Sequence, residues 1–522
     1  MNTNLFKTKF LLIAVVAVSL FSCEKEFLDR PTEDSYNVDD FYKTTDQVLV
    51  STNALYAAPW FNFNTNTIWT IGELSSGNGR TWDPRNADFT NFAINGNHST
   101  LTQAWESLYA VVAQSNAVIN TLPEAAGEEV PQDVVDTAVG EARFIRSVAY
   151  FYLVRIFGSV PIIDNNNDYV LEPVVPRNTV ADVYRFITED LEFAIENITT
   201  YDKASAPGRV SSNGAKAMLA KVYLYMEKYS DAYQLADNVI NNGEFKLFGG
   251  DLQYSDSDDS GSYYDLFTPE NDNNQESIFA LQWTASPSYG EGNGLQSLFG
   301  PSGFTGGSDG WSAIGPSPDL LAAYEDQDED VRYYATFMRR EAEYPDLNGG
   351  YTVPDNVDAQ GTDHIVKKYV VGSAAATLRD DGSGQTTTSN NTYILRYADL
   401  LLVHAEAALR GGGSVVNGVE SYNKVRLRAG LEKNEAPTLD DIFNERRVEL
   451  AFEFEFWYDV VRLGEAEAIE FLSNSDRGTI NNDTGEVEPE FYTATADDLL
   501  FPYPTTETQN NPALLEAPVP YY

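Results

Sequence analysis

The chain has 522 residues, of which 43% are hydrophobic and 13% aromatic, so it can bury a large core. Its formal net charge of −45 disfavours nucleic acid and anionic lipid headgroups as partners, and a strongly anionic polysaccharide would need a local basic patch. Cys23 is its single cysteine, so no disulfide can form within the chain and stability must come from the core.

The N-terminus has the pattern of a lipoprotein signal. Lys7 and Lys9 precede an apolar run over residues 10–21, which is too short to span a bilayer and typical of a signal-peptide core. Cleavage after Ser22 would leave Cys23 as the lipid-bearing N-terminal residue; the alternative is an ordinary secretory signal with a stray cysteine. We expect a signal peptide over residues 1–22 and a mature chain over residues 23–522, tethered through Cys23 to a membrane that it does not span.

Helical periodicity is strong over about residues 100–245. One apolar stripe runs from Ile145 to Ile156 and ends before a glycine. Thr179 and Asp182 form a capping-box pattern at the start of the next helix. A helical hairpin follows over residues 215–240, and its small residues have the spacing of a tetratricopeptide repeat. Such a unit needs stacked neighbours to bury its face, which predicts a helical platform.

A loop-rich insertion over about residues 249–392 interrupts this platform. It carries half of the 36 glycines, and only residues 275–284 have the pattern of a strand. Helical periodicity then returns over about residues 393–470, with one helix from Tyr393 to Arg410 and another from Val419 to Leu431. The expected fold is therefore mainly α: a tetratricopeptide-like platform that carries an irregular, loop-rich lobe with few short strands.

Segments spread over the whole mature chain carry a family resemblance. Among them are CEKEFLD at 23–29, WESLYAVVAQSNAVINTLP at 105–123, EARFIRSVAYFYLVRIFGSVPII at 141–163, YILRYADLLLVHAEAAL at 393–409 and NERRVELAFEFEFWYDVVRLG at 444–464. Together they resemble the RagB/SusD family of outer-membrane nutrient-binding lipoproteins of Bacteroidetes. The resemblance implies four tetratricopeptide units with an irregular ligand-binding face. It also implies a non-enzymatic protein that binds glycans, or in some members peptides, and caps a SusC-like TonB-dependent transporter.

Loop aromatics are the candidates for ligand binding. Flat rings can stack on the C–H faces of sugar rings, while amide, carboxylate and guanidinium groups bind hydroxyls from loops held by a rigid scaffold. The residues that meet this description, at positions where the resemblance places the binding face, are Trp82, Trp311, Tyr289, Arg80, Asn78, Asp83 and Trp283. The alternative is that each ring packs beneath its own loop, and the strand-like context of Trp283 favours burial.

The carboxylate-rich segment from Glu445 to Asp459 invites comparison with glycosidases, which use a pair of carboxyl groups. Its charges recur at helical spacing around a Phe/Trp stripe, which indicates intrahelical ion pairs and docking instead of catalysis. No catalytic residues are therefore expected.

Metal binding is not expected either. Asp326, Asp328 and Asp330 imitate the start of a calcium loop, but Val331 stands where the turn needs glycine, so we expect solvated acids. The acidic run at 256–259 could hold calcium only loosely, and His404 on its apolar stripe is interpreted as a core residue. We expect no metal and no cofactor.

The favoured function is capture of an oligosaccharide at the cell surface and its delivery to the TonB-dependent transporter, from a lipid-anchored position on the outer membrane. Capture of a peptide or glycopeptide by the same platform is the alternative within the family. A surface glycoside hydrolase is supported only by the abundance of acids, and a tetratricopeptide adaptor would bind protein alone. Tryptophans on loops away from the helical grooves favour ligand binding over the adaptor.

Overall fold

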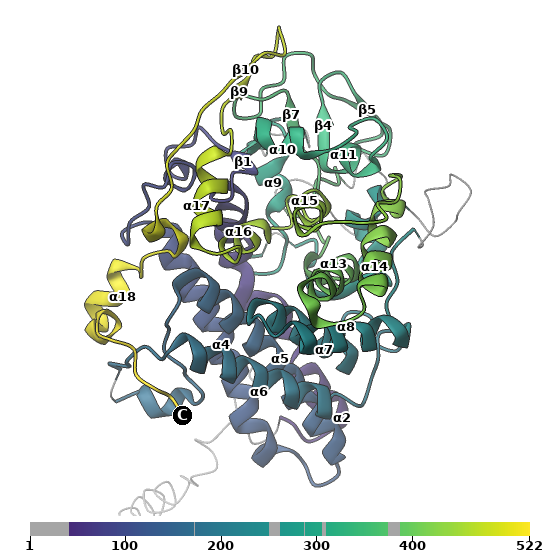
Figure 1. The fold of residues 1–522 in the computed structure, drawn as a ribbon. Coiled ribbons are helices and arrows are strands. Elements are labelled where there is room, and N and C mark those ends of the chain that lie inside the picture. Colours follow the sequence, from purple (N-terminus) through teal and green to yellow (C-terminus); the bar gives the residue numbers. More distant parts are fainter. Residues whose placement is uncertain (1–40, 172, 250–261, 287, 305–309, 374–386) are drawn as a thin grey trace, which may run out of the picture.

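The structure of the protein is a computed structural model that describes residues 41–522, apart from residues 172, 250–261, 287, 305–309 and 374–386 (Figure 1). The expected signal peptide, Cys23 and the acidic run at 256–259 therefore lie outside the described residues. No helix among the residues that are described combines the length and the apolar character needed to cross a bilayer.

A row of helices forms the platform in the lower half of Figure 1. In chain order these are α4 (Ser99–Ala125), α5 (Gln132–Phe157), α6 (Val180–Asn197), α7 (Ser212–Tyr225) and α8 (Tyr229–Asn242), and each packs against the next. After the insertion, α13 (Tyr397–Ala407) packs on α8, and α14 (Val415–Arg428) packs on α13. The platform thus continues across the inserted lobe, as expected for stacked helical units.

Local signals set the ends of these helices. The Thr179 hydroxyl accepts a hydrogen bond from the Asp182 N–H at 3.1 Å and donates to its carboxylate at 2.8 Å, which confirms the predicted cap of α6. Gly158 ends α5 and Gly243 ends α8, with φ angles of 73° and 76°. Both glycines adopt a conformation that other residues avoid, so they stop the helices where the sequence predicts.

The lobe in the upper half of Figure 1 contains short elements joined by long loops, and the mainly helical fold is confirmed. Its helices are α9 (Leu295–Phe299), α10 (Pro318–Ala323) and α11 (Val331–Thr336). Its strands form two-stranded antiparallel pairs: β1 (Gly79–Arg80) with β3 (Gly315–Pro316), β4 (Phe337–Arg339) with β7 (His364–Val366), and β5 (Glu343–Tyr344) with β6 (Tyr351–Thr352).

One pair of strands closes the base of the lobe and corrects a prediction. β2 (Ser277–Leu281) falls within the predicted strand and pairs antiparallel with β8 (Thr392–Arg396). Residues 393–396, predicted as the start of a helix, are therefore extended, because β2 supplies their backbone partners from more than a hundred residues away. The helix after the glycines begins at Val415 instead of Val419, with the Ser414 side chain as its cap.

The C-terminal part closes the molecule around the platform and the lobe. It contains α15 (Leu439–Glu449), α16 (Phe456–Val461), α17 (Glu465–Asn474), α18 (Thr505–Asn510) and the hairpin of β9 (Thr479–Ile480) and β10 (Val487–Glu488). The shorter helices before the platform are α2 (Thr45–Val50), the 3-10 turns η2 (Asn53–Tyr56) and η3 (Ala58–Trp60), the π-helical turns η4 (Phe63–Thr67) and η5 (Thr70–Leu74), and α3 (Ala87–Thr90).

Buried ion pairs join α15 to the rest of the molecule. Arg396, at the end of β8, contacts Glu276, Glu449 and Glu453 at 2.7, 2.5 and 2.6 Å. Burial acts to raise the pKa of Glu449, but Arg428, Arg396 and Arg332 outweigh it and hold that pKa well below its ordinary value. The carboxylates are structural, as predicted. Asp459 forms an intrahelical pair with Arg462 at 2.9 Å, as expected, but most of the arginine partners come from other elements.

Two smaller expectations are also resolved. Asp330 is buried against Arg332 at 2.7 Å, so it is not a solvated acid, whereas Asp326 and Asp328 are exposed. His404 is buried, stacks on Tyr233 at 4.4 Å and bonds Ser421 at 2.9 Å, which confirms it as a core residue. Within the described residues, no cluster of three or more His, Cys, Asp or Glu is placed to hold a metal ion.

Candidate functional site

Two of the seven tryptophans are exposed, and both were singled out by the sequence. Trp82 is 56% exposed and Trp311 is 58% exposed, while Trp60, Trp69, Trp105, Trp283 and Trp457 are all buried. Exposing two large rings sacrifices the free energy that their burial would supply, roughly 1.5–3 kcal/mol for a large apolar side chain. Trp82 and Trp311 are therefore the candidates for a binding surface.

Backbone contacts bring the two tryptophan loops side by side. β1 ends just before Trp82, and β3 begins shortly after Trp311; the two strands pair with Gly79 opposite Pro316 and Arg80 opposite Gly315. The Thr81 hydroxyl donates to the Ala313 carbonyl at 2.9 Å, which extends the junction toward the rings. We call Trp82 and Trp311 with these two loops the tryptophan surface.

Arg80 supports the Trp82 ring from within the protein. Its guanidinium lies 5.1 Å from the ring centroid, and its Nε donates to the Arg477 carbonyl at 3.2 Å. Burial lowers its pKa, although Glu490 and Asp358 oppose that shift. With only 4% of its surface exposed, Arg80 holds the ring in place instead of presenting a charge to solvent.

Asp83 remains at the edge of the surface and is engaged by Arg85. The two side chains form an ion pair at 2.6 Å, and the hydrogen bond from Arg85 lowers the pKa of the Asp83 carboxyl. The aspartate is held ionised and 17% of its side chain is exposed, so its carboxylate can still accept a hydrogen bond from a hydroxyl.

Asn78 lies in the interior, which corrects its expected role as a hydroxyl contact. Its amide nitrogen donates to Glu73 at 3.1 Å, and its carbonyl oxygen accepts from Arg447 Nε at 2.8 Å. Burial raises the pKa of Glu73 to about 7, against the opposing hydrogen bonds from Asn78 and the Phe454 N–H. Asn78 therefore anchors the base of the Trp82 loop.

Trp283 is also internal, as its strand-like context favours. It is 6% exposed, and its indole N–H donates to the Thr392 hydroxyl at 3.1 Å. Phe61 contacts its ring with centroids 6.3 Å apart. In this conformation Trp283 is part of the packing behind the binding face, and it is left out of the ligand contacts that we propose below.

Tyr289 forms a separate exposed group. It is 74% exposed, its ring meets Phe61 edge-on at 4.6 Å, and its hydroxyl donates to Asn62 at 2.8 Å. These contacts anchor Tyr289 to the segment before η4. The structure thus joins Trp82 to Trp311, while Tyr289 stands on a different support.

The structure adds residues that the sequence gave no reason to select. The Gln360 side chain accepts from the Trp82 N–H and donates to the Ser312 carbonyl, both at 2.6 Å. Phe491 is 56% exposed, and it follows Glu490, whose carbonyl bonds the Arg477 N–H at 2.8 Å. An aromatic residue in a glycine-rich loop can be recognised in a sequence as a candidate for ligand binding. Neither Gln360 nor Phe491 has a comparable sequence signal.

Charge around the tryptophan surface is not basic. Arg80 and Arg477 are buried, Arg85 is paired with Asp83, and Glu490, Asp358 and Asp476 interact electrostatically with Arg80. There is no basic excess in this part of the described chain that would offset the overall charge of −45. The surface therefore suits an uncharged ligand better than an anionic one.

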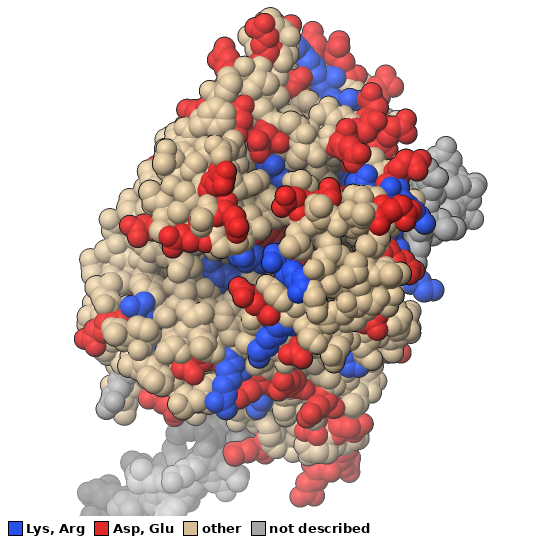
Figure 2. Space-filling view, viewed as in Figure 1, with Lys and Arg blue, Asp and Glu red and all other residues tan. Residues whose placement is uncertain are grey.

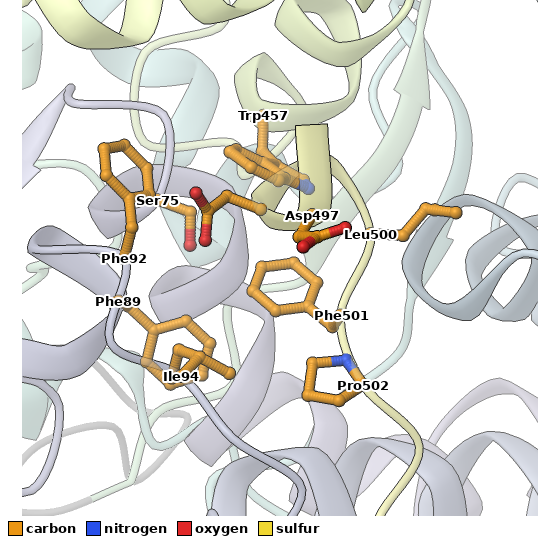
Figure 3. A pocket seen from close by; sticks show the side chains of 10 residues that line it. Ser75, Phe89, Phe92, Ile94, Trp457, Asp497, Leu500, Phe501 and Pro502 are labelled. Atoms are coloured by element: carbon orange, nitrogen blue, oxygen red, sulfur yellow. The ribbon is translucent and has the colours of Figure 1, made fainter. Parts of the chain in front are cut away.

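Hollows elsewhere are less suited to a sugar. Figure 3 shows a crevice between Phe89, Phe92, Trp457 and Phe501, with a volume of about 30 Å³, which is room for one or two waters. A larger hollow of about 530 Å³ lies beside α15 and α17, but its Arg410 and Arg462 already pair with Glu406. Figure 2 shows acidic residues scattered over the visible face, with Lys and Arg gathered near its middle.

Comparisons with known proteins agree with one another. Residues 275–522 match a family model described as "SusD family", and residues 26–224 match one described as "Starch-binding associating with outer membrane". A SusD-like protein of Bacteroides ovatus is 35% identical, with 99% of this chain and 98% of the relative covered.

Solved structures extend the likeness to the whole fold. A crystal structure with a xylogluco-oligosaccharide superposes with a TM-score of 0.79 at 33% identity, covering 91% of this chain and 99% of that one. A laminarin-binding SusD-like protein superposes with a TM-score of 0.69 at 26% identity, covering 90% of this chain and 98% of that one. The two halves of the chain and the complete fold thus point to the same relatives.

Proposed function

Because the chain belongs to the SusD family of binding proteins, which are non-catalytic, we propose that it captures oligosaccharides at the cell surface and delivers them to a TonB-dependent transporter. The observation that carries this proposal is the exposure of Trp82 and Trp311 on adjoining loops of a protein that buries its other five tryptophans. Two exposed rings on adjoining loops can each stack on a sugar of one chain.

The ligand is a neutral oligosaccharide. Xylogluco-oligosaccharide and laminarin, with which two relatives are associated, are both uncharged and built on glucose. The lack of a basic excess around the tryptophan surface and the acidic character of the whole chain favour the same class here. Hydroxyl contacts exchange with water at little net gain, so the stacked rings supply most of the affinity, and the Kd lies in the micromolar range or above.

Calorimetry on the mature chain tests the proposal. The ligands are xylogluco-oligosaccharides, laminari-oligosaccharides and oligogalacturonates of similar length, with a peptide of similar size as the test of the family alternative. We expect binding of a neutral oligosaccharide and none of oligogalacturonate. Removing a central aromatic commonly costs about 2 kcal/mol or more, so Trp82→Ala and Trp311→Ala each weaken binding about thirtyfold or more.

Two controls make the result interpretable. Melting curves show whether each variant remains folded, and Tyr522→Ala removes a ring that is 46% exposed and lies against Arg185 of α6 in the platform. Neutral oligosaccharides that bind both tryptophan variants as tightly as the parent would refute the proposed surface. Binding of the peptide alone would overturn the glycan assignment.

Delivery requires a docked partner, and we propose that the protein covers a SusC-like TonB-dependent transporter, tethered through Cys23 to the outer membrane. Permanent interfaces of this kind bury over about 2,000 Å². Affinity purification from native membranes in mild detergent should recover a transporter in near-equal amount. Recovery of this chain alone would contradict the docked arrangement.

A further inference from the structure

The junction of the tryptophan surface depends on a turn that is distant in sequence. Gln360 follows Trp82 by 278 residues, yet its side-chain oxygen accepts from the Trp82 N–H at 2.6 Å. Its side-chain nitrogen donates at 2.6 Å to the carbonyl of Ser312, the residue after Trp311. One amide therefore binds the backbone of both tryptophan loops, and it uses its donor and its acceptor to do so.

The backbone of this turn is itself unusual. Gln360 has a φ of 62° and Gly361 a φ of 87°, two consecutive residues in the left-handed region. Turns with two consecutive residues of positive φ favour Asn-Gly, because the short Asn side chain tolerates the left-handed conformation better than a longer side chain such as Gln. Gln360 adopts this strained backbone conformation, and its side chain, which is longer than that of Asn, reaches both loops.

Gly361 fits the turn closely against the same surface. A Cβ at this position would lie 2.3 Å from Arg80 Nη1 and 2.8 Å from Trp82 Cζ2, so the glycine backbone packs directly on the ring and its supporting arginine. On the far side, the Ile480 N–H donates to the Gly361 carbonyl at 2.8 Å. The β9–β10 hairpin thus braces the turn from behind.

We propose that Gln360 is a positioning residue that sets the spacing between Trp82 and Trp311, and so selects oligosaccharides long enough to stack on both rings. This inference rests on the proposed function for its ligand, but the clamp itself exists without one. Fixing the two loops before binding spares the ligand the entropy of ordering them. The effect is confined to ligands that contact both rings, because a short sugar on one ring does not sense the spacing.

Gln360→Met tests the clamp with a side chain of similar length that cannot make the two hydrogen bonds. Hydrogen exchange, resolved at single amides, should show the Trp82 N–H exchanging about five- to tenfold faster, as expected from the loss of one net hydrogen bond. Gln360→Glu keeps the acceptor but cannot donate to Ser312, so it should preserve protection of the Trp82 N–H. Gln234→Met, on the exposed face of α8, is the matched control and should change nothing.

Binding is then compared for a long xylogluco-oligosaccharide and for methyl β-glucoside, whose single sugar ring can stack on only one tryptophan. In Gln360→Met and Gln360→Glu we expect the long ligand to bind about five- to twentyfold more weakly, while methyl β-glucoside binds as it does to the parent. Equal weakening for both ligands, with a lower melting temperature, would make Gln360 merely structural and overturn the inference. Unchanged exchange at Trp82 in Gln360→Met would overturn the clamp.

The two proposals can fail separately. If the parent binds no oligosaccharide, the proposed function fails, whereas hydrogen exchange at Trp82 still decides whether Gln360 clamps the loops. If the parent binds, the Trp82 amide is freed in Gln360→Met and the affinity for the long ligand does not change, then the clamp exists but the spacing does not select ligands. That result would refute the positioning role while leaving the glycan assignment intact.

Discussion

Three tryptophans outside the helical patterns have different environments, and the sequence context of Trp283 differs from that of the other two because it is strand-like. Trp82 and Trp311 project into solvent, while Trp283 follows β2 directly and hydrogen-bonds Thr392 in the neighbouring strand. The strand-like sequence around Trp283 indicates burial, and the pairing of β2 with β8 supplies the partner that covers its ring. Residue type alone therefore does not separate Trp283, which packs at the base of the lobe, from the exposed Trp82 and Trp311.

This difference in burial predicts a large loss of stability when Trp283 is replaced and little change when Trp311 is replaced. Trp283→Ala should lower the free energy of unfolding by about 3–5 kcal/mol, the usual loss for a buried Trp. Trp311→Ala should change it by less than about 0.5 kcal/mol, as for most surface substitutions. Urea unfolding followed by circular dichroism measures both. Equal destabilisation by the two substitutions would show that Trp311 is packed and that its exposure is not a property of the protein in solution.

Sequence reasoning succeeded where the cause was local. The cap at Thr179 and the glycines at 158 and 243 act within one helical turn, so the helix ends could be predicted. It failed where the cause was distant: Asn78 is buried by Glu73 and Arg447, and β8 is a strand because β2 pairs with it. Gln360 could not be found at all, because its two partners lie far from it in the chain.

At the scale of elements, α15 joins the platform to the lobe through buried charges. Glu449 in α15 contacts Arg332 from the lobe and both Arg396 and Arg428 from the platform side. Buried ion pairs of this kind add little net stability over apolar packing, but removing one partner leaves an uncompensated charge. The lobe that carries Trp311 is thereby held to the helices that carry the rest of the molecule.

Arg396→Met should therefore lower the free energy of unfolding by about 3–5 kcal/mol, because Glu276, Glu449 and Glu453 lose a shared partner. Arg185→Met is the matched control: its pair with Glu189 lies on the surface and contributes less than about 1 kcal/mol. Chemical unfolding of both variants provides the comparison. Similar stabilities for the two would mean that the buried network does not hold the lobe.

At the scale of the whole molecule, depressed carboxyl pKa values link folding to pH. Burial acts to raise the pKa of Glu406, but Arg462 and the other nearby arginines outweigh it and lower the pKa from 4.5 to about 2. The unfolded chain therefore binds a proton before the folded chain does. The stability that Glu406 contributes is complete above about pH 4.5 and is lost as the pH falls toward 2.

Glu406→Gln removes this titration and so isolates its effect. The parent should be more stable than the variant at pH 6, and the difference should shrink steadily between about pH 4.5 and pH 2. Urea unfolding at a series of pH values measures it, with Glu465→Gln at the exposed start of α17 as the control. A difference between parent and Glu406→Gln that stays constant over this range would show that the Arg462 pair does not depress the pKa.

The proposed attachment of the molecule to the membrane depends on residues that precede the described structure. The first described residues run into α2, and the Lys43 ammonium donates to the Ala125 carbonyl at the end of α4, so the proposed tether would begin at that end of the platform. Residues 23–40 separate the proposed lipid on Cys23 from this point, and each acyl CH₂ buried in the membrane contributes about 0.8 kcal/mol.

Cys23→Ala should therefore release the protein from membranes and abolish labelling with palmitate, while leaving oligosaccharide binding by the released protein unchanged. Ser22→Ala, which keeps a small residue before the cysteine, should stay lipidated. Membrane fractionation with metabolic labelling decides the matter: a Cys23→Ala protein that remains with the membrane and is still labelled would show that the anchor lies elsewhere in the chain.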